Sequence, residues 1–462
     1  MISVIKHLLE GKNILILGYG REGQSSFRFL NRLFPELSPG IADSDEKLLE
    51  KHPELSGRQA IHIGTDYLSY CKNYDMVIKT PGIPYERVLE HCTADRITSQ
   101  TDLFLRAFSE KVIGVTGTKG KSTTATLIYH ILKTSGRKVL LSGNIGVPPL
   151  DTAEMLEEDS LVVFEMSSHQ LEHIRIAPHI AVILNIFPEH LDHYRDFTAY
   201  KMAKFNIHHM QREGNLLVYN ADDSFIAGLI AESEKAITLR SFSNDELKNA
   251  DAFIRDGEII VGTAMGEGFK VLPGNAADLP GNHNRMNLMA ALLACLGAGA
   301  DAEDIKQGLA SYRRPEHRLE YAGTYRGIRF YDDSIATIPE ACISALHTLD
   351  RVDLLILGGY DRKLDYHILY RKLLSDIIPV IVFMGDAGKR MYSELQGSLS
   401  GKSKCFLAEG MEDTFRIIRK ELKDGDVCLL SPAAASYGMF KNFEERGAIF
   451  KKMAAALQQP PL

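Results

Sequence analysis

The segment that most constrains the fold of this chain runs from Val112 to Thr124. An apolar strand enters a glycine-rich turn, which leads to Lys121, Ser122 and a helix with apolar residues at helical spacing. Backbone N–H groups in such a turn point toward phosphate oxygens, the lysine neutralises phosphate charge, and the hydroxyl reaches a bound Mg²⁺. The helix N-terminus adds its dipole to the anion site. The segment therefore predicts a phosphate-binding loop inside an α/β domain.

This loop is a variant of the Walker A pattern. The strict pattern has a glycine where this chain has Val115, and the glycines here are displaced to Gly114 and Gly117. The alternative interpretation is an ordinary turn rich in glycine and threonine. The succession of strand, loop and helix favours phosphate binding.

Composition limits the classes of protein to which the chain can belong. A length of 462 residues suggests about three domains. The net charge of −7 and the lack of lysine or arginine runs give no support to nucleic-acid binding. Six cysteines without a CxxC pair predict reduced packing residues, not a disulfide or zinc framework. No apolar run approaches the roughly 20 residues of a membrane span and no signal peptide is recognisable, so we expect a cytoplasmic protein.

Residues 1–105 form the first of three predicted α/β blocks. A strand at 13–17 enters a complete G-x-G-x-x-G motif, and Asp43 ends a second strand 20 residues after the last glycine of that motif. By itself this pattern predicts a dinucleotide-binding Rossmann unit. A third strand, at 75–79, leads into a turn at 80–83. The alternative interpretation of the G-x-G-x-x-G motif is a structural glycine turn that binds nothing.

Residues 106–312 form the second block, in which three apolar strands lead to polar side chains. Ligands of open α/β sheets bind beyond the carboxyl ends of the strands. We therefore expect Ser122, Glu165 and His190 to converge, and a hydroxyl, a carboxylate and an imidazole beside a phosphate loop suggest bound Mg²⁺. The alternatives are a helix cap or ion pair for Glu165 and a buried, hydrogen-bonded histidine for His190. The three strands are expected at 111–115, 161–164 and 181–184.

The local sequence does not decide the roles of two further pairs of residues in this block. Lys201 and Lys204 lie one turn apart on an expected helix, where solvated positions are the ordinary interpretation. Asn284 and Asn287 open a helix rich in alanine and leucine that extends through Gly297. These amides either cap the helix or hydrogen-bond an adenine, and local physics does not choose between the two.

Residues 313–462 form the third block. Polar residues recur at the carboxyl ends of its strands, which predicts a second ligand edge. A phosphate-loop domain between two other α/β domains suggests phosphoryl transfer across a cleft, with a kinase or a nucleotide-driven switch as open alternatives. The strands of this block are expected at 326–331, 353–357, 380–384 and 427–430.

Ordered motifs along essentially the whole chain resemble those of the Mur ligase family. They comprise the phosphate loop at 116–122, Glu165–Glu172, Asn185 with Glu189 and His190, Gly281–Asn284 with Asn287, and His317 with Arg318. The segments 333–337, 430–436 and 440–447 resemble the branch of the family that adds D-glutamate. The resemblance implies an α/β fold in three domains: a Rossmann-like UDP-binding domain at 1–105, a central P-loop ATPase-like domain at 106–312, and a C-terminal Rossmann-like amino-acid-binding domain at 313–462.

The same resemblance implies an activity. ATP would phosphorylate the carboxylate of UDP-N-acetylmuramoyl-L-alanine, and the amine of D-glutamate would attack the acyl phosphate, releasing phosphate and ADP. This is a step in the synthesis of peptidoglycan precursors in the cytoplasm. The glycine fingerprint of the first block would then hold UDP rather than NAD. The resemblance further implies a monomer without nucleic-acid partners or membrane insertion.

Site residues also follow from the resemblance. The catalytic residues would be Lys121, Glu165, His190 and Lys204. Contacts to ATP would come from Gly117, Thr118, Lys119, Gly120, Lys121, Ser122, Thr123, Asn284, Asn287, Arg318 and Asp333. Contacts to the UDP substrate would come from Gly20, Arg21, Glu22, Asp43, Ser44, Thr80, Gly82, Asn144, Gln170 and His190. Contacts to D-glutamate would come from Thr337, Arg362, Ser436 and Phe443. Mg²⁺, expected as two ions, would be held by Ser122, Glu165, His190 and a carbamate formed from CO₂ on Lys204.

The chain departs from the pattern of this family in places. Lys119 stands where many relatives have asparagine, Ile335 and Arg362 stand where the D-glutamate-adding pattern has lysine, and Gly438 replaces an aspartate. Two competing functions are a different ligase of the family and an NAD-dependent oxidoreductase or nucleotide switch. Against the first, folylpolyglutamate synthase lacks a separate N-terminal UDP domain, and the Asp-x-Pro-Arg-type motif of the diaminopimelate-adding or lysine-adding ligase is absent from this sequence.

Overall fold

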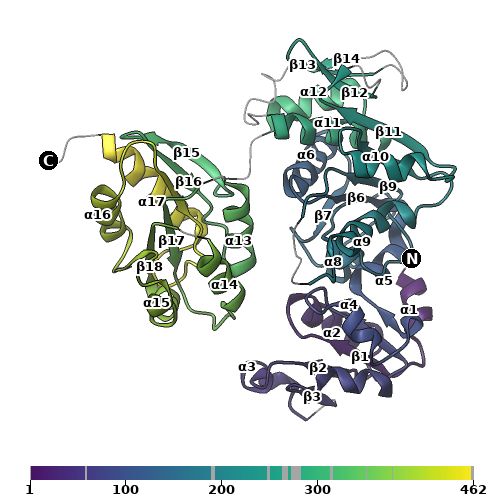
Figure 1. Cartoon of the computed structure of the whole chain (residues 1–462). Helices are drawn as coiled ribbons and strands as arrows, with labels where there is room; N and C mark the ends of the chain where they lie inside the picture. The colour runs from purple at the N-terminus through teal and green to yellow at the C-terminus, as the bar shows by residue number, and fades with distance from the viewer. Residues whose placement is uncertain are drawn as a thin grey trace. The chain divides into compact units, whose positions relative to one another are not determined.

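The structure, a computed structural model, describes residues 2–57, 60–188, 193–246, 250–262, 269–271, 282–312, 316–349, 351–376 and 378–458. The chain divides into two compact units, Met1–Tyr312 and Arg313–Leu462 (Figure 1). Three sheets flanked by helices lie in the described residues, which confirms the predicted α/β class. Among the same residues, no helix combines the length and the apolar character that crossing a bilayer requires.

The first unit begins with a five-stranded parallel sheet in the order β3-β2-β1-β4-β5. The strand order reverses beside β1, and ligands of such sheets bind at this switch point. Every residue of β1 is buried, as expected for a strand covered on both faces. The strands are β1 (Ile14–Leu17), β2 (Gly40–Asp43), β3 (Ile61–Ile63), β4 (Met76–Lys79) and β5 (Ile97–Thr98). The helices are α1 (Ile2–Leu9), α2 (Arg21–Leu33), α3 (Leu48–Lys51), α4 (Tyr85–Leu89), η1 (Pro53–Leu55), η2 (Tyr67–Asn73) and η3 (Ala94–Arg96).

The same unit continues with a nine-stranded sheet in the order β14-β13-β12-β11-β10-β9-β6-β8-β7. Strands β6 to β12 pair in parallel, and β13 and β14 extend the sheet as antiparallel strands. The strands are β6 (Val112–Thr116), β7 (Val139–Gly143), β8 (Leu161–Glu165), β9 (Ile180–Ile183), β10 (Leu216–Asn220), β11 (Thr238–Ser243), β12 (Ala252–Arg255), β13 (Glu258–Val261) and β14 (Phe269–Val271). The helices are α5 (Gln100–Phe108), η4 (Ser109–Lys111), α6 (Lys121–Thr134), α7 (Pro149–Ala153), α8 (Ser168–Leu171), α9 (Phe197–His209), α10 (Ser224–Ala231), α11 (Asn282–Gly297) and α12 (Ala302–Ser311).

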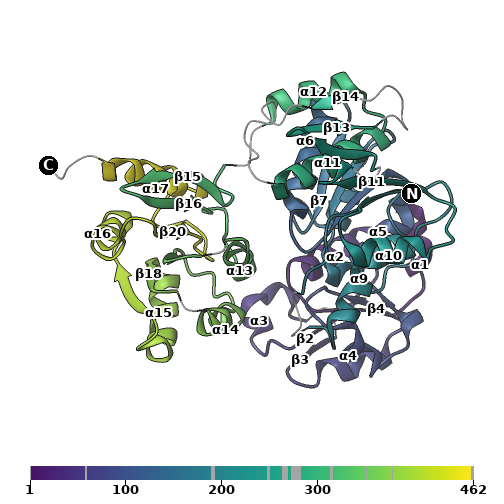
Figure 2. The same cartoon turned by 45° about the horizontal axis from the view of Figure 1, so that its top comes forward.

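Helix α6 has the amphipathic pattern that the sequence predicts. Its apolar residues, among them Leu127 and Ile131, are fully buried in a core shared with α11 and the nine-stranded sheet. Gly136 follows the helix with φ of +81°, the left-handed conformation that often ends helices. The two helices lie side by side on one face of the sheet (Figure 2). This packing fixes the direction of α6, whose N-terminus carries the phosphate loop.

One hydrophobic cluster joins the two sheets of the first unit. It contains Ile16 of β1, Phe104 of α5 and Phe164 of β8, so α5 packs toward both sheets. The domain boundary proposed at 105/106 falls inside α5 and stays a prediction.

The second unit is a six-stranded sheet in the order β15-β16-β20-β17-β18-β19, parallel except for β15. The strands are β15 (Glu320–Tyr325), β16 (Ile328–Asp332), β17 (Leu354–Gly358), β18 (Val380–Met384), β19 (Lys404–Ala408) and β20 (Val427–Leu430). The helices are α13 (Pro339–Thr348), α14 (His367–Ser375), α15 (Gly385–Leu399), α16 (Met411–Glu421), α17 (Phe443–Ala455) and η8 (Ala456–Gln458). The antiparallel β15–β16 hairpin was not expected, because its first strand is mostly half-exposed and lacks an apolar run.

Candidate functional site

The phosphate loop lies between the carboxyl end of β6 and the N-terminus of α6, as predicted. Gly120 has φ of +86°, and a Cβ at this position would clash with the side-chain oxygen of Asn287. Glycine is therefore required both by the backbone conformation and by the close approach of α11. Asn287 in turn donates from its amide to Asn284 Oδ1 at 3.4 Å. The structure thus brings both predicted adenine-binding asparagines to the phosphate loop.

A hydroxyl and a carboxylate meet beside this loop. Ser122 Oγ, in the first turn of α6, donates to Glu165 Oε2 at 2.8 Å, and Asn144 Nδ2 donates to Glu165 Oε1 at 3.1 Å. Glu165 ends β8 and is 1 % exposed. Hard oxygen donors of these two kinds are the ligands that Mg²⁺ takes in nucleotide sites. Ser122 and Glu165 therefore fit a magnesium ion.

Two lysines donate to the backbone of the loop. Lys121 Nζ lies 2.9 Å from the carbonyl oxygens of Gly117 and Thr118. Lys204 Nζ, from α9, lies 2.9 Å from the same Gly117 oxygen. Lys204 is 1 % exposed, so the solvated position that its local sequence suggests is wrong. Lys119 and Thr123, the other predicted contacts, lie in the loop and in the first turn of α6.

Asn185, which follows the neighbouring strand β9, holds the loop, although no role of its own was predicted for it. Its Oδ1 accepts from the Lys119 N–H at 2.9 Å, and its Nδ2 donates to the Lys119 carbonyl at 3.1 Å. The available signal was an amide side chain just after β9, the strand next to β6. His190, predicted to bind metal and substrate, lies outside the described residues.

The predicted UDP-substrate residues gather at the carboxyl edge of the first sheet. Asp43, at the end of β2, accepts from the Tyr19 N–H at 2.7 Å. The Thr80 hydroxyl donates to the Leu17 carbonyl at 3.0 Å, next to the tight turn at Gly18. The remaining predicted contacts on this sheet lie nearby: Gly20 at the N-cap of α2, Arg21 and Glu22 in its first turn, Ser44 after β2, and Gly82 in the turn after β4.

Two of these residues reach across to the nine-stranded sheet. Glu22 Oε1 accepts from Gln170 Nε2 at 2.9 Å, and Arg21 donates to the carbonyl of Gly146, two residues after Asn144. Burial raises the pKa of the Glu22 carboxyl above its ordinary value. The structure therefore connects the predicted substrate positions of the first sheet with those of the second.

The second unit carries the other predicted residues. Asp333 follows β16 and accepts from Ser431 Oγ at 2.6 Å and from the Leu319 N–H at 3.0 Å. Burial raises the pKa of Asp333 to about 7. Arg318 lies just before Leu319, and its positive charge acts in the opposite direction on that pKa.

Of the predicted D-glutamate contacts, two meet directly. Arg362 Nη2 donates to the Thr337 carbonyl at 2.9 Å. Ser436 is buried in the segment after β20, and the carbonyl of Phe443 accepts from Ser334 Oγ at 2.8 Å. These four residues border the carboxyl edge of the six-stranded sheet, as the sequence predicts for a second ligand edge.

A histidine and two carboxylates in this unit approach one another but do not fit a metal. Among the described residues, His317, Glu320 and Asp332 have ligand atoms within 4.8 Å of one another. His317 Nδ1 is already bonded to Asp332 at 2.6 Å, and Glu320 is paired with Lys451 at 2.9 Å. A cation there would have to displace both partners.

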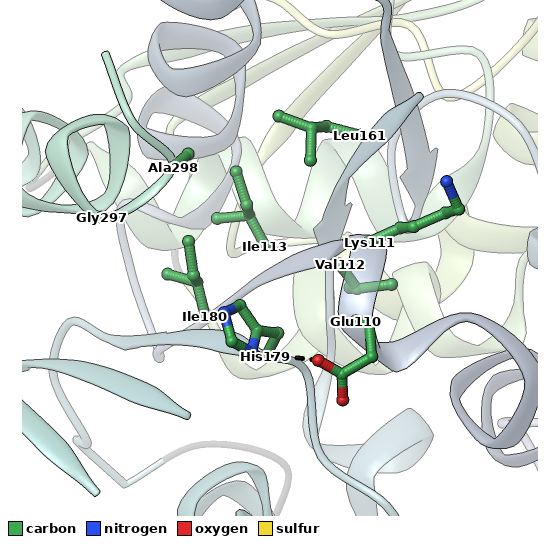
Figure 3. A pocket seen from close by; sticks show the side chains of 9 residues that line it. All are labelled: Glu110, Lys111, Val112, Ile113, Leu161, His179, Ile180, Gly297 and Ala298. Carbon is green, nitrogen blue, oxygen red and sulfur yellow. Dashed lines mark ion pairs between the residues drawn. The ribbon is translucent and has the colours of Figure 1, made fainter. Parts of the chain in front are cut away.

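A cavity of about 200 Å³ lies at the opposite edge of the nine-stranded sheet from the phosphate loop. Figure 3 shows the starts of β6 and β9 lining it, with an ion pair between Glu110 and His179 at its mouth. None of the predicted site residues lines this cavity. It is therefore separate from the candidate site.

The sequence of this chain is similar to those of known proteins. Residues 115–295 match the Mur ligase middle domain. The UDP-N-acetylmuramoylalanine–D-glutamate ligase of Clostridium botulinum (strain 657 / Type Ba4) is 32% identical, over 98% of this chain and 99% of that protein. The protein of the same name from Koribacter versatilis (strain Ellin345) is also 32% identical, over 98% of this chain and 99% of its own length.

A solved structure shares the fold. The crystal structure of a murein peptide ligase mpl from Psychrobacter arcticus 273-4 matches with a TM-score of 0.50 at 18% identity, covering 98% of this chain and 100% of that one. With the full-length sequence similarity above, this chain belongs to the Mur ligase family, in the branch whose curated members are named UDP-N-acetylmuramoylalanine–D-glutamate ligase.

Proposed function

We propose that this chain is an ATP-dependent ligase that joins D-glutamate to UDP-N-acetylmuramoyl-L-alanine. The observation that carries the proposal is the contact of Ser122 with Glu165 at 2.8 Å beside a phosphate loop, in a chain of this family. The product would be a precursor of peptidoglycan, made in the cytoplasm. The chain would act as a monomer, without nucleic acid or membrane insertion.

The ATP phosphates would lie over the loop at the N-terminus of α6. Lys121 would then exchange its two backbone carbonyl partners for phosphate oxygens, which are stronger acceptors because they are charged. Phosphoryl transfer needs positioning and charge neutralisation more than covalent chemistry, and a lysine beside the transferred phosphate supplies both. Asn284 and Asn287, held against the loop by α11, would contact the adenosine part, with Arg318 and Asp333 as further ATP contacts.

Magnesium would be held by Ser122 and Glu165, with His190 and a carbamate on Lys204 as ligands of a second ion. When bound, Mg²⁺ neutralises the charge that develops on the transferring phosphate. The buried Lys204 amine would react with CO₂ to form the carbamate and release a proton. Its contact with the Gly117 carbonyl, shared with Lys121, supports this assignment, because a carbamate would remove one of two neighbouring positive charges.

The other two substrates would occupy the two flanking sheets. The carboxyl edge of the first sheet, with Asp43, Thr80 and Glu22, would bind the UDP part of UDP-N-acetylmuramoyl-L-alanine. Gln170 and Asn144, which contact Glu22 and Glu165, would lead from there toward the reacting carboxylate. D-Glutamate would bind at the edge of the second unit, where Arg362 is suited to grip a carboxylate. These assignments correspond to domains at 1–105, 106–312 and 313–462.

The reaction balances in two steps. An oxygen of the L-alanyl carboxylate attacks the γ-phosphorus and ADP leaves. The amine of D-glutamate then attacks the acyl carbon, loses a proton, and expels phosphate as the amide bond forms.

The test is phosphate release by the purified chain. We expect release only when ATP, Mg²⁺, UDP-N-acetylmuramoyl-L-alanine and D-glutamate are all present, with one phosphate for each product molecule detected by mass. Release without either acceptor substrate, or equal use of L-glutamate, would contradict the proposal.

A further inference from the structure

A buried ion pair joins the two sheets of the first unit. Lys79, the last residue of β4, places its Nζ 3.2 Å from Oε2 of Glu172, which follows α8. The side chains are 0 % and 8 % exposed. The pair therefore crosses from the sheet expected to bind UDP to the segment that begins at the metal-binding candidate Glu165.

The same ammonium group closes the turn after β4. Lys79 Nζ donates to the Ile83 carbonyl at 2.7 Å and to the Thr80 carbonyl at 3.3 Å. This turn carries Thr80 and Gly82, both proposed to contact the nucleotide sugar. The conformation of this turn thus depends on the Lys79 ammonium group, which is also paired with Glu172 beside the nine-stranded sheet.

Glu172 is held in turn by residues of the nine-stranded part. Its second carboxylate oxygen, Oε1, lies 2.7 Å from Nε2 of His193, whose side chain is 10 % exposed. The backbone carbonyl of Glu172 accepts from Asn206 Nδ2 at 3.1 Å. The carboxylate is therefore fixed from both sides, and it presents a rigid anchor to Lys79.

Stability alone does not account for such a pair. Desolvation offsets much of the attraction between buried charges, and apolar residues of similar size often stabilise a protein as well or better. What an apolar pair does not reproduce is the pair of hydrogen bonds from Lys79 to the turn carbonyls.

We propose that Lys79, Glu172 and His193 form a positioning triad that sets the 80–83 turn relative to the Ser122–Glu165 site and so determines the affinity for the nucleotide-sugar substrate. This inference rests on the proposed function for the identity of the substrate. The triad touches no reacting atom and acts through the turn. The contact between Glu22 and Gln170 lies across the same two sheets but leaves the turn carbonyls untouched.

The test compares Lys79→Met with the double variant Lys79→Met/Glu172→Met. We expect both to raise the KM for UDP-N-acetylmuramoyl-L-alanine by about tenfold or more, the effect of losing hydrogen bonds from a charged donor. The KM for ATP and for D-glutamate and the value of kcat should change by less than about threefold, because the phosphate loop keeps its own contacts. The single variant leaves the buried Glu172 carboxylate without its lysine partner, and the double variant removes both charges, so a rise in KM that both variants share is not due to a buried charge that has lost its partner.

Lys138→Met is the matched control. Lys138 forms an exposed ion pair with Glu157, with 2.6 Å between the Lys138 Nζ and Glu157 Oε2 atoms. This pair is not part of either site. The kinetic constants of this variant should equal those of the unaltered chain. Variants of Lys79 that unfold at a lower temperature but bind the nucleotide sugar with unchanged affinity in titration calorimetry would overturn the triad's role. If the unaltered chain itself neither binds nor converts this substrate, the proposed function fails, and calorimetry on the unaltered chain separates the two outcomes.

Discussion

Lys121 and Lys204 donate hydrogen bonds to the same acceptor, the carbonyl oxygen of Gly117, each at 2.9 Å. The two ammonium groups therefore lie within twice that distance of each other, in a largely buried part of the loop. Like charges so close repel, and an anion between them or the loss of one charge relieves the repulsion. The arrangement is suited to bind phosphate and to carry a modified lysine.

Replacing Lys121 with methionine should remove the main cation at the transferring phosphate. We expect kcat to fall by about a hundredfold to a thousandfold, the range for deleting one group that stabilises a charged transition state. Steady-state phosphate release measures the effect. Lys133→Met, an exposed change on the same helix, should keep the rate of the unaltered chain, and an equally active Lys121→Met would refute the phosphate-loop assignment.

Replacing Lys204 with arginine should be as damaging as replacing it with alanine. Arginine keeps the positive charge but forms no stable carbamate, so we expect turnover to fall by about a hundredfold or more in either case. Added bicarbonate should restore neither variant. A ¹³C signal of a carbamate in the unaltered chain, absent from the arginine variant, checks the chemistry directly. Lys201→Arg, one turn away, is the control, and a fully active Lys204→Arg would rule out the carbamate.

Glu165→Gln tests the magnesium site. The amide keeps the size of the side chain and its bond to Ser122 but loses the charge that binds a hard cation. We expect the Mg²⁺ concentration for half-maximal rate to rise by at least about tenfold. Excess Mg²⁺ should recover part of the activity of the Glu165→Gln variant. A chelator should abolish the activity of the unaltered chain. An unchanged Mg²⁺ dependence would contradict the assignment of Glu165.

Arg390 and Asp361 are expected to control D-glutamate binding. Arg390 donates two bonds to Asp361, both at 3.0 Å, and a third to the Leu364 carbonyl, which fixes the loop that carries Arg362. A lysine ammonium group does not reproduce the two parallel N–H bonds that the Arg390 guanidinium donates to Asp361. Arg390→Lys should therefore raise the KM for D-glutamate by about tenfold while the KM for ATP is unchanged. A parallel rise in both constants would argue for a general structural effect instead.

Protonation of Asp333 should make the stability of the chain depend on pH. Its folded pKa of about 7 lies above the unfolded value of about 3.9, so between these values the folded state holds a proton that the unfolded state has lost. The contribution of this group therefore falls as pH rises, by up to about 4 kcal/mol across that window. Urea unfolding at several pH values measures it. Asp333→Asn should flatten the curve between about pH 4 and about pH 7, and an identical slope in the variant would contradict the account.

Local sequence was enough to predict the parts of the site that depend on short segments. The phosphate loop, α6 and the carboxylate at the end of β8 follow from apolar runs, glycine positions and strand-to-loop order. The family resemblance supplied the roles of Asn287 and Lys204. Periodicity alone left Lys204 as a solvated helix position, and its burial reflects how α9 packs beneath the loop.

Other features depended on residues that are distant in sequence. The bond between Glu22 and Gln170, and that between Lys79 and Glu172, join side chains of different sheets. No local pattern encodes the register in which two sheets pack, so these partners could not be predicted. The antiparallel edge strand β15 was missed for a related reason, since its residues are half-exposed or exposed and form no continuous apolar run.

The central claim is that the carboxylate of UDP-N-acetylmuramoyl-L-alanine is phosphorylated by ATP and then joined to D-glutamate. The most direct measurement uses this substrate with ¹⁸O in its carboxylate and follows the label by mass spectrometry of the released phosphate. We predict that each phosphate carries one oxygen from the carboxylate, and that the product gains the mass of glutamate less water. Phosphate free of ¹⁸O, or turnover without a coupled product, would contradict the account.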